Sequence, residues 1–175
     1  MTDIIRDILS SDLKHKEKVL KISEHVGSDK NLIAQLFDLL KNGSDVEKGT
    51  AAEVMKFVSR DHPDLMLPYI DVLIEYIDYK APRVKWGCPE SIGNIAKSYP
   101  DKVEGAIPKL FKNLNDDSTV VRWCAAFALA EIAKYNKKRQ KDLTSKFNEL
   151  IETEKNNGVK NVFRKALKDI EKRNE

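Results

Sequence analysis

The chain has 175 residues, of which 41% are hydrophobic and 34% are charged, and its formal net charge is +3. This composition is too apolar for a disordered chain and too highly charged for a membrane protein, so it indicates a soluble globular protein. No apolar stretch approaches the roughly 20 residues of a membrane span, and the amino terminus lacks the pattern of a signal peptide. The expected location is therefore cytoplasmic.

Two short helices are predicted at the amino terminus, over residues 2–9 and 12–26. Their apolar residues recur at helical spacing and are Ile4, Ile5, Ile8 and Leu9, followed by Val19, Ile22 and Val26. A stack of repeats needs a terminal unit that covers its first core face. Residues 1–27 are therefore predicted to be a helical cap.

A pattern that recurs every 37 residues follows the cap. Three sets of equivalent positions step through the chain, namely Ile33, Ile70, Ile107 and Thr144; Leu36, Leu73, Leu110 and Phe147; and Leu40, Ile77, Leu114 and Ile151. Within each unit the spacing is i, i+3, i+7, which is one face of a helix. A second helix in each unit is marked by Val46, Val84, Val121 and Val159, and eight residues later by Val54, Ile92, Leu129 and Leu167.

These patterns predict one domain over residues 1–175 in which helical hairpins repeat. The predicted repeats span 28–62, 63–99, 100–137 and 138–173. Ser44 and Glu47 form the pattern of a capping box, and Pro82 suits a first helical turn. Pro89 falls inside the second helix of the second repeat, where it should kink that helix or delay its start.

The third unit, IPKLFKNLNDDSTVVRWCAAFALAEIAK, resembles the HEAT repeat. Asp116 and Arg122 stand where this family has a turn acid and an arginine at the start of the second helix. The resemblance covers residues 30–173, and it implies an all-α, right-handed α-α superhelix (solenoid) of about four HEAT-like hairpins. In the other repeats the residues in place of Arg122 are Glu47, Lys85 and Lys160. A ladder from acid to arginine is therefore not expected between all repeats.

The resemblance also implies a partner-binding surface, because the second helix of each HEAT-like hairpin lines the concave face. The residues expected there are Lys48, Trp86, Glu90, Asn94, Trp123, Phe127, Glu131 and Lys165. The two tryptophans would lie on neighbouring repeats and form one aromatic platform, or else each would pack against the neighbouring turn. The expected partner is a helix or an extended peptide of another protein.

No catalytic or cofactor site is expected. His15, His25 and His62 have no second metal ligand at helical spacing, and Cys88 and Cys124 are predicted to be reduced, packed side chains. Nucleotide-binding loops and hydrolase motifs are absent from the sequence. The predicted function is therefore that of a non-catalytic protein-binding scaffold or adaptor, without metal, small-molecule cofactor or membrane partner.

Two alternatives remain. HEAT-like DNA glycosylases that excise alkylated bases use tryptophans with a nearby carboxylate, and Trp86, Glu90 and Trp123 are similar in kind. Residues 136–175 hold 12 lysines and arginines against 7 aspartates and glutamates, which suits nucleic acid, an acidic protein or a merely solvated terminal helix pair. The second alternative is an accessory or chaperone subunit of one dedicated enzyme.

Overall fold

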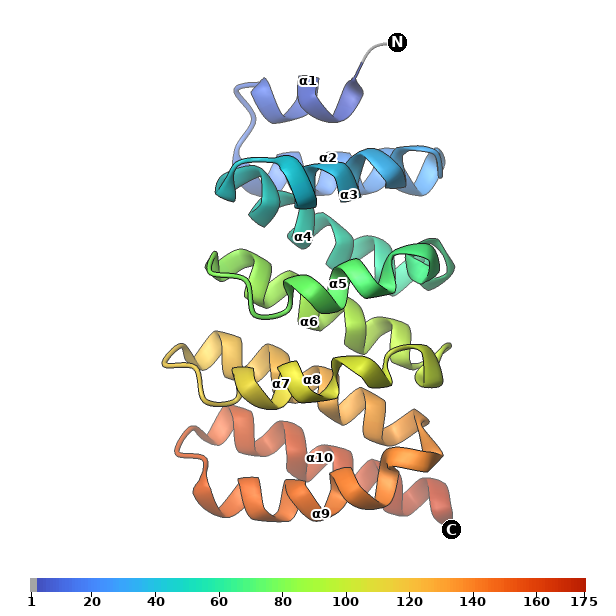
Figure 1. Ribbon diagram of the computed structural model, residues 1–175, viewed down its shortest axis with the longest axis vertical. Helices are drawn as coiled ribbons and strands as arrows, with labels where there is room; N and C mark the ends of the chain where they lie inside the picture. Colours follow the sequence, from blue (N-terminus) through green and yellow to red (C-terminus); the bar gives the residue numbers. More distant parts are fainter. Residues whose placement is uncertain (1–2) are drawn as a thin grey trace.

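The computed structural model describes residues 3–175 and consists of stacked helical hairpins (Figure 1). The α-helices are α1 (Ile4–Ser10), α2 (His15–Ser28), α3 (Leu32–Asn42), α4 (Asp45–Asp61), α5 (Ile70–Tyr76), α6 (Pro82–Ala96), α7 (Ile107–Asn113), α8 (Thr119–Tyr135), α9 (Lys137–Thr153) and α10 (Asn157–Asn174). Short 3₁₀ helices, η1 (Pro63–Tyr69), η2 (Pro100–Lys102) and η3 (Glu104–Ala106), precede α5 and α7. The predicted all-α superhelix is confirmed.

The helices form two rows (Figure 1). The inner row contains α2, α4, α6, α8 and α10, and from α2 onward each of these helices packs directly on the next. The outer row contains α1, α3, α5, α7 and α9, whose members contact their inner-row neighbours far more than one another. A stack bends towards the row whose helices lie closer together, so we infer that the inner row lines the concave side. At the amino-terminal end, the short helix α1 contacts both α2 and α3.

Glycines allow the inner-row helices to approach closely. A Cβ atom on Gly87 of α6 would lie 2.3 Å from the carbonyl oxygen of Ala52 in α4. A Cβ atom on Gly93, two turns further along α6, would lie 2.6 Å from the ring of Phe127 and 3.1 Å from the Cα of Ala128 in α8. No side chain larger than hydrogen fits at either crossing without a shift of the neighbouring helix. These two glycines therefore allow α6 to pack closely against both α4 and α8.

The ends of the helices follow the sequence signals, with one exception. In the capping box at the start of α4, the backbone N–H of Ser44 donates to Glu47 Oε2 at 2.8 Å, and Glu47 N–H donates to Ser44 Oγ at 3.3 Å. Pro82 occupies the first turn of α6, as predicted. The delayed start expected from Pro89 is wrong, because α6 begins at Pro82 and continues through Pro89 to Ala96.

The core runs through the whole stack between the two rows. In the three outer-row ladders the members are buried except for the half-buried Ile107, Thr144 and Ile151. Cys88 and Cys124 are buried and unpaired, as expected. Burial raises the pKa of the Cys88 thiol to about 12 and also raises that of Cys124. Both thiols are therefore protonated packing groups at neutral pH.

In the first repeat, the predicted register of the second helix is wrong by one residue. Val84 is the third residue of α6, but the third residue of α4 is Glu47, and Val46 points outward with 75% of its surface exposed. Lys48 is thus the equivalent of Lys85 and Arg122. The prediction failed because Val46, next to Glu47, and Val54, eight residues later, have the same spacing as the valine and the apolar residue of the other repeats.

Candidate functional site

Because of this register, Lys48 does not reach the concave face, and its predicted exposure there is wrong. The residue is 7% exposed, and its amino group donates to the carbonyl oxygen of Leu40 at 2.8 Å, near the end of α3. It also lies over the rings of Tyr76 and Tyr79, 5.2 and 5.5 Å from their centroids. Lys48 therefore holds the hairpin turn together.

A groove between α8 and α10 brings four of the predicted residues together. Its lining residues are Trp123, Phe127, Ala130, Glu131, Lys134, Val162, Lys165 and Ala166, and they enclose a cavity of about 250 Å³. We call this the α8/α10 groove. Trp123 is 38% exposed, and its ring stacks parallel to that of Phe127, with centroids 5.8 Å apart. Since Trp123 and Phe127 are four residues apart, the same helical stripe carries both rings.

The polar residues predicted on α6 are engaged with the neighbouring helices. Asn94 Nδ2 donates to the carbonyl oxygen of Lys56 at 2.9 Å and to Ser59 Oγ at 3.1 Å, both on α4. Glu90 lies 3.8 Å from the amino group of Lys56 and accepts a hydrogen bond from Cys124 Sγ at 3.4 Å. Burial raises the pKa of Glu90, although Lys56 partly opposes the shift. Glu90 and Asn94 therefore join the inner-row helices to one another.

The structure does not unite the two tryptophans. Trp86 is half-buried and lines a separate cavity with Val46 and Arg83 at the hairpin-turn edge. Within residues 3–175, its indole Nε1 is buried without a hydrogen-bond partner, and its ring does not pair with that of Trp123. The single aromatic platform is therefore not formed, and Trp123 pairs with Phe127 instead.

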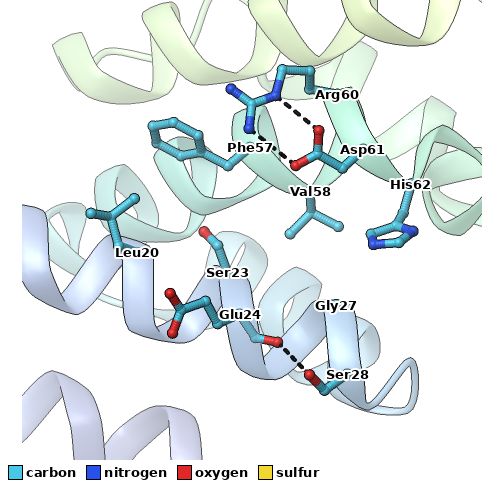
Figure 2. A pocket seen from close by; sticks show the side chains of 10 residues that line it. All are labelled: Leu20, Ser23, Glu24, Gly27, Ser28, Phe57, Val58, Arg60, Asp61 and His62. Atoms are coloured by element: carbon cyan, nitrogen blue, oxygen red, sulfur yellow. Dashed lines mark hydrogen bonds and ion pairs between the residues drawn. The ribbon is translucent and has the colours of Figure 1, made fainter.

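A second groove, between α2 and α4, was not predicted (Figure 2). Leu20 is 42% exposed and lies across a cavity of about 390 Å³ from Phe57. Arg60 makes a bidentate contact with Asp61 at 3.0 Å, and its guanidinium carbon lies 5.6 Å from the centroid of the Phe57 ring. The feature of the sequence that could have indicated this groove is Leu20, an apolar residue that lies outside the buried face of its helix.

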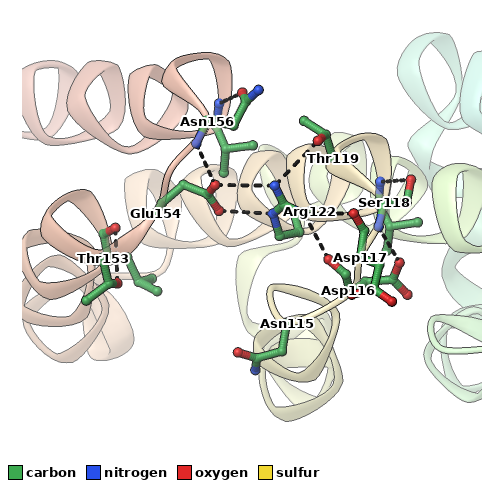
Figure 3. Close-up of polar contacts among 12 residues, drawn as sticks. Asn115, Asp116, Asp117, Ser118, Thr119, Arg122, Thr153, Glu154 and Asn156 are labelled. Carbon is green, nitrogen blue, oxygen red and sulfur yellow. Dashed lines mark hydrogen bonds and ion pairs between the residues drawn. The ribbon is translucent and has the colours of Figure 1, made fainter.

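Along the hairpin-turn edge, ion pairs connect successive repeats (Figure 3). Arg122 Nε lies 3.1 Å from Glu154 Oε2 of the next repeat, and Arg122 Nη1 donates to the carbonyl oxygen of Asp116 at 2.9 Å. Asp116 in turn accepts a hydrogen bond from Lys85 Nζ of the preceding repeat at 2.6 Å. The ladder thus extends over three repeats, because Lys85 serves in place of an arginine.

This ladder should make the protein sensitive to acid. The hydrogen bond from Lys85 holds the pKa of Asp116 below its ordinary 3.8. Burial raises the pKa of Glu154, but hydrogen bonds from the backbone of Asn156 and from Arg122 outweigh it and bring that pKa below 4.5. Because the unfolded state binds more protons, these groups stabilise the fold above their unfolded pKa values, and the gain is lost as pH falls through the folded values.

The expected result is a free energy of unfolding that declines as the pH falls from roughly 5 to 2, with a shallower decline in the Asp116→Asn variant. Urea denaturation at a series of pH values would measure both slopes. Equal slopes in the wild type and the variant would contradict the assigned role of Asp116.

The described residues carry no sign of a metal or membrane site. Residues 3–175 contain no group of three or more His, Cys, Asp or Glu side chains placed to hold a metal ion. The ring of His15 lies against Glu53 instead, with Nε2 2.7 Å from Oε2. In the same part of the chain, no helix combines the length and apolar character needed to cross a lipid bilayer.

Comparison with known proteins supports the repeat architecture. A family model described as non-SMC mitotic condensation complex subunit 1 matches residues 91–175. A designed armadillo repeat protein in complex with the peptide (KR)4 is 19% identical, with a TM-score of 0.75, and the match covers 96% of this chain and 81% of that one.

Two further solved structures are similar. An engineered protein from the Northeast Structural Genomics Consortium is 18% identical, with a TM-score of 0.75, over 97% of this chain and 79% of that one. A computationally designed armadillo repeat protein for modular peptide recognition is 19% identical, with a TM-score of 0.74, over 95% and 81%. No curated protein matches the sequence. The paired helix rows and these matches show that the chain has the fold of a HEAT/armadillo-type helical-repeat solenoid.

Proposed function

We propose that the protein is a non-catalytic scaffold or adaptor that binds a helix or an extended peptide of a partner protein in the α8/α10 groove. The observation that carries the proposal is the exposed ring of Trp123, stacked on Phe127 beside a cavity with an aliphatic floor. Tryptophan is enriched at interaction hot spots, where a large apolar area is buried at low entropic cost.

The similar proteins support a binding role. One of the similar designed armadillo proteins was solved in complex with the peptide (KR)4, another was designed for modular peptide recognition, and the matching family is that of a subunit of a complex. The chemistry of the described residues also favours binding over catalysis. Cysteine nucleophiles need a lowered pKa, whereas burial raises the pKa of both thiols here.

Trp123→Ala should lower the amount of partner protein retained from a nuclease-treated lysate at least about tenfold, while changing the free energy of unfolding by less than about 1 kcal/mol. The small stability cost is expected because the indole is partly exposed. Val120→Ala is the matched control, since Val120 is 49% exposed on the same helix but does not line the groove. Quantitative mass spectrometry of the retained proteins and urea denaturation would measure the two effects.

Three outcomes would contradict the proposal. If Trp123→Ala unfolds the protein, the indole belongs to the core. If Trp123→Ala and Val120→Ala retain the same proteins, the groove is not the binding site. If every protein that is retained from an untreated lysate is lost when the lysate is treated with nuclease, nucleic acid is the ligand.

A further inference from the structure

The last helix carries an excess of positive charge that is not neutralised within the described chain. α10 contains six lysines and arginines against two acidic residues. Within residues 3–175, the salt bridge made by α10 runs from Asp169 to Lys134, and Arg164, Lys165 and Lys168 form none. All three of these cations are exposed.

Elsewhere in the stack, some lysines and arginines are paired with acids of a neighbouring repeat, while others, such as the exposed Lys97 and Lys141, form no salt bridge within the described part of the chain. Asp78 accepts from both Lys109 and Lys112, at 3.0 and 2.6 Å, and Arg139 lies 3.3 Å from Glu104. Cations in the last turn of a helix are also stabilised by its dipole, but Arg164, Lys165 and Lys168 lie in the middle of α10. Arg164, Lys165 and Lys168 are therefore exposed cations that have no carboxylate partner within residues 3–175.

The unpaired cations adjoin the α8/α10 groove. Lys165 lines the cavity itself, Lys168 follows it by three residues, and Arg164 precedes Lys168 by four, so Lys168 is a neighbour of both on the exposed side of α10. Between α8 and α10, Lys134 contacts both Glu131 and Asp169, so these three groups sum to one negative charge, against the three positive charges of Arg164, Lys165 and Lys168. The free charge beside the apolar floor is therefore positive.

We propose that the α8/α10 groove recognises an acidic segment of a partner protein that carries one bulky apolar side chain. This inference rests on the proposed function and specifies the chemistry of its ligand. The apolar side chain packs against Trp123, Phe127 and Val162, and the flanking carboxylates meet Lys165 and the cations that follow it on α10.

The test uses the full chain with Trp86→Phe, which leaves Trp123 as the single tryptophan and places an intrinsic fluorophore in the groove. The probes are a synthetic peptide with one central Phe flanked by Glu residues, the same peptide with Lys in place of Glu, and a single-stranded oligonucleotide. The acidic peptide should change Trp123 emission saturably, and its affinity should fall as salt is raised.

Lys165→Glu should weaken binding of the acidic peptide on the order of tenfold, because it reverses the charge at the groove edge. Lys141→Glu makes the same charge change on an exposed residue of α9, in the outer row, and should leave the affinity within about twofold. Since both lysines are exposed, neither variant is expected to alter the fold, and circular dichroism would verify this.

Several results would overturn the inference. A Lys peptide or an oligonucleotide that binds more tightly than the Glu peptide would show that the groove prefers another chemistry. Equal losses of affinity in Lys165→Glu and Lys141→Glu would mean that only the net charge of the protein matters. If the change in emission did not saturate at about 1 mM Glu peptide, the groove would not bind an acidic segment specifically. For the Trp123→Ala variant, which lacks the fluorophore, isothermal titration calorimetry would measure peptide binding. A basic peptide whose binding needs Trp123 would leave the proposed function intact, whereas peptide binding that is indifferent to Trp123→Ala would overturn both.

Discussion

Replacement of Gly87 by alanine should lower the free energy of unfolding by about 2–3 kcal/mol. The new Cβ would lie 2.3 Å from the carbonyl oxygen and 2.4 Å from the carbonyl carbon of Ala52, which are backbone atoms that cannot rotate away. α4 and α6 must therefore separate, and the cost of such overpacking outweighs the gain of about 1 kcal/mol in helix propensity. Urea denaturation followed by far-UV circular dichroism would measure the loss.

Gly27→Ala is the matched control for this prediction. Gly27 also lies within a helix, but a Cβ atom there would meet the side chain of His62 at an ordinary 3.5 Å. Its substitution should be neutral or should stabilise the protein by up to about 1 kcal/mol. If Gly87→Ala behaved like Gly27→Ala, the close contact of α4 with α6 would not exist in solution.

The sequence was sufficient to predict the fold because the core repeats at a fixed step. Residues such as Leu36, Leu73 and Leu110 are at most 1% exposed and lie 37 residues apart, so burial alone imposes the pattern. The register of a single helix is less constrained. Val54 and Met55 are both completely buried in α4, so two alignments of that helix with the next satisfy the apolar pattern equally well.

The candidate site was predicted less well because its residues interact across helices. Helical spacing places Glu90 and Asn94 on the stripe of Trp86, but it carries no information about Lys56 and Ser59, which engage them from α4. Trp123, by contrast, stacks within its own helix. Contacts within one helix can be inferred from spacing, whereas contacts between repeats depend on how closely the helices approach, and here glycine sets that distance.

The ladder between repeats shows the same distinction. Asp116 and Arg122 were recognised because they match the HEAT pattern, but Glu154 and Lys85 were not recognised as their partners. A lysine reaches the turn acid of the next repeat as an arginine does, although with a single charged group in place of a planar fork. The continuity of the ladder therefore became visible only with the distances between the repeats.

Arg122→Ala should lower the free energy of unfolding by about 3 kcal/mol. The side chains of Arg122 and Glu154 are 17% and 10% exposed, and the guanidinium also donates to the carbonyl oxygens of Asp116 and Asp117. Its removal leaves a largely buried carboxylate without its cation, which commonly costs about 3–5 kcal/mol. The lower end applies because the backbone N–H of Asn156 still donates to Glu154 at 2.8 Å.

Arg139→Ala provides the comparison, because Arg139 also pairs with an acid of another repeat but is 47% exposed, and its partner Glu104 is 34% exposed. Its loss should cost less than about 1 kcal/mol in urea denaturation. If the cost at Arg122 arises from the stranded carboxylate, adding Glu154→Gln to Arg122→Ala should restore part of the stability. Equal costs for Arg122→Ala and Arg139→Ala would instead mean that the ladder stabilises the stack no more than surface ion pairs do.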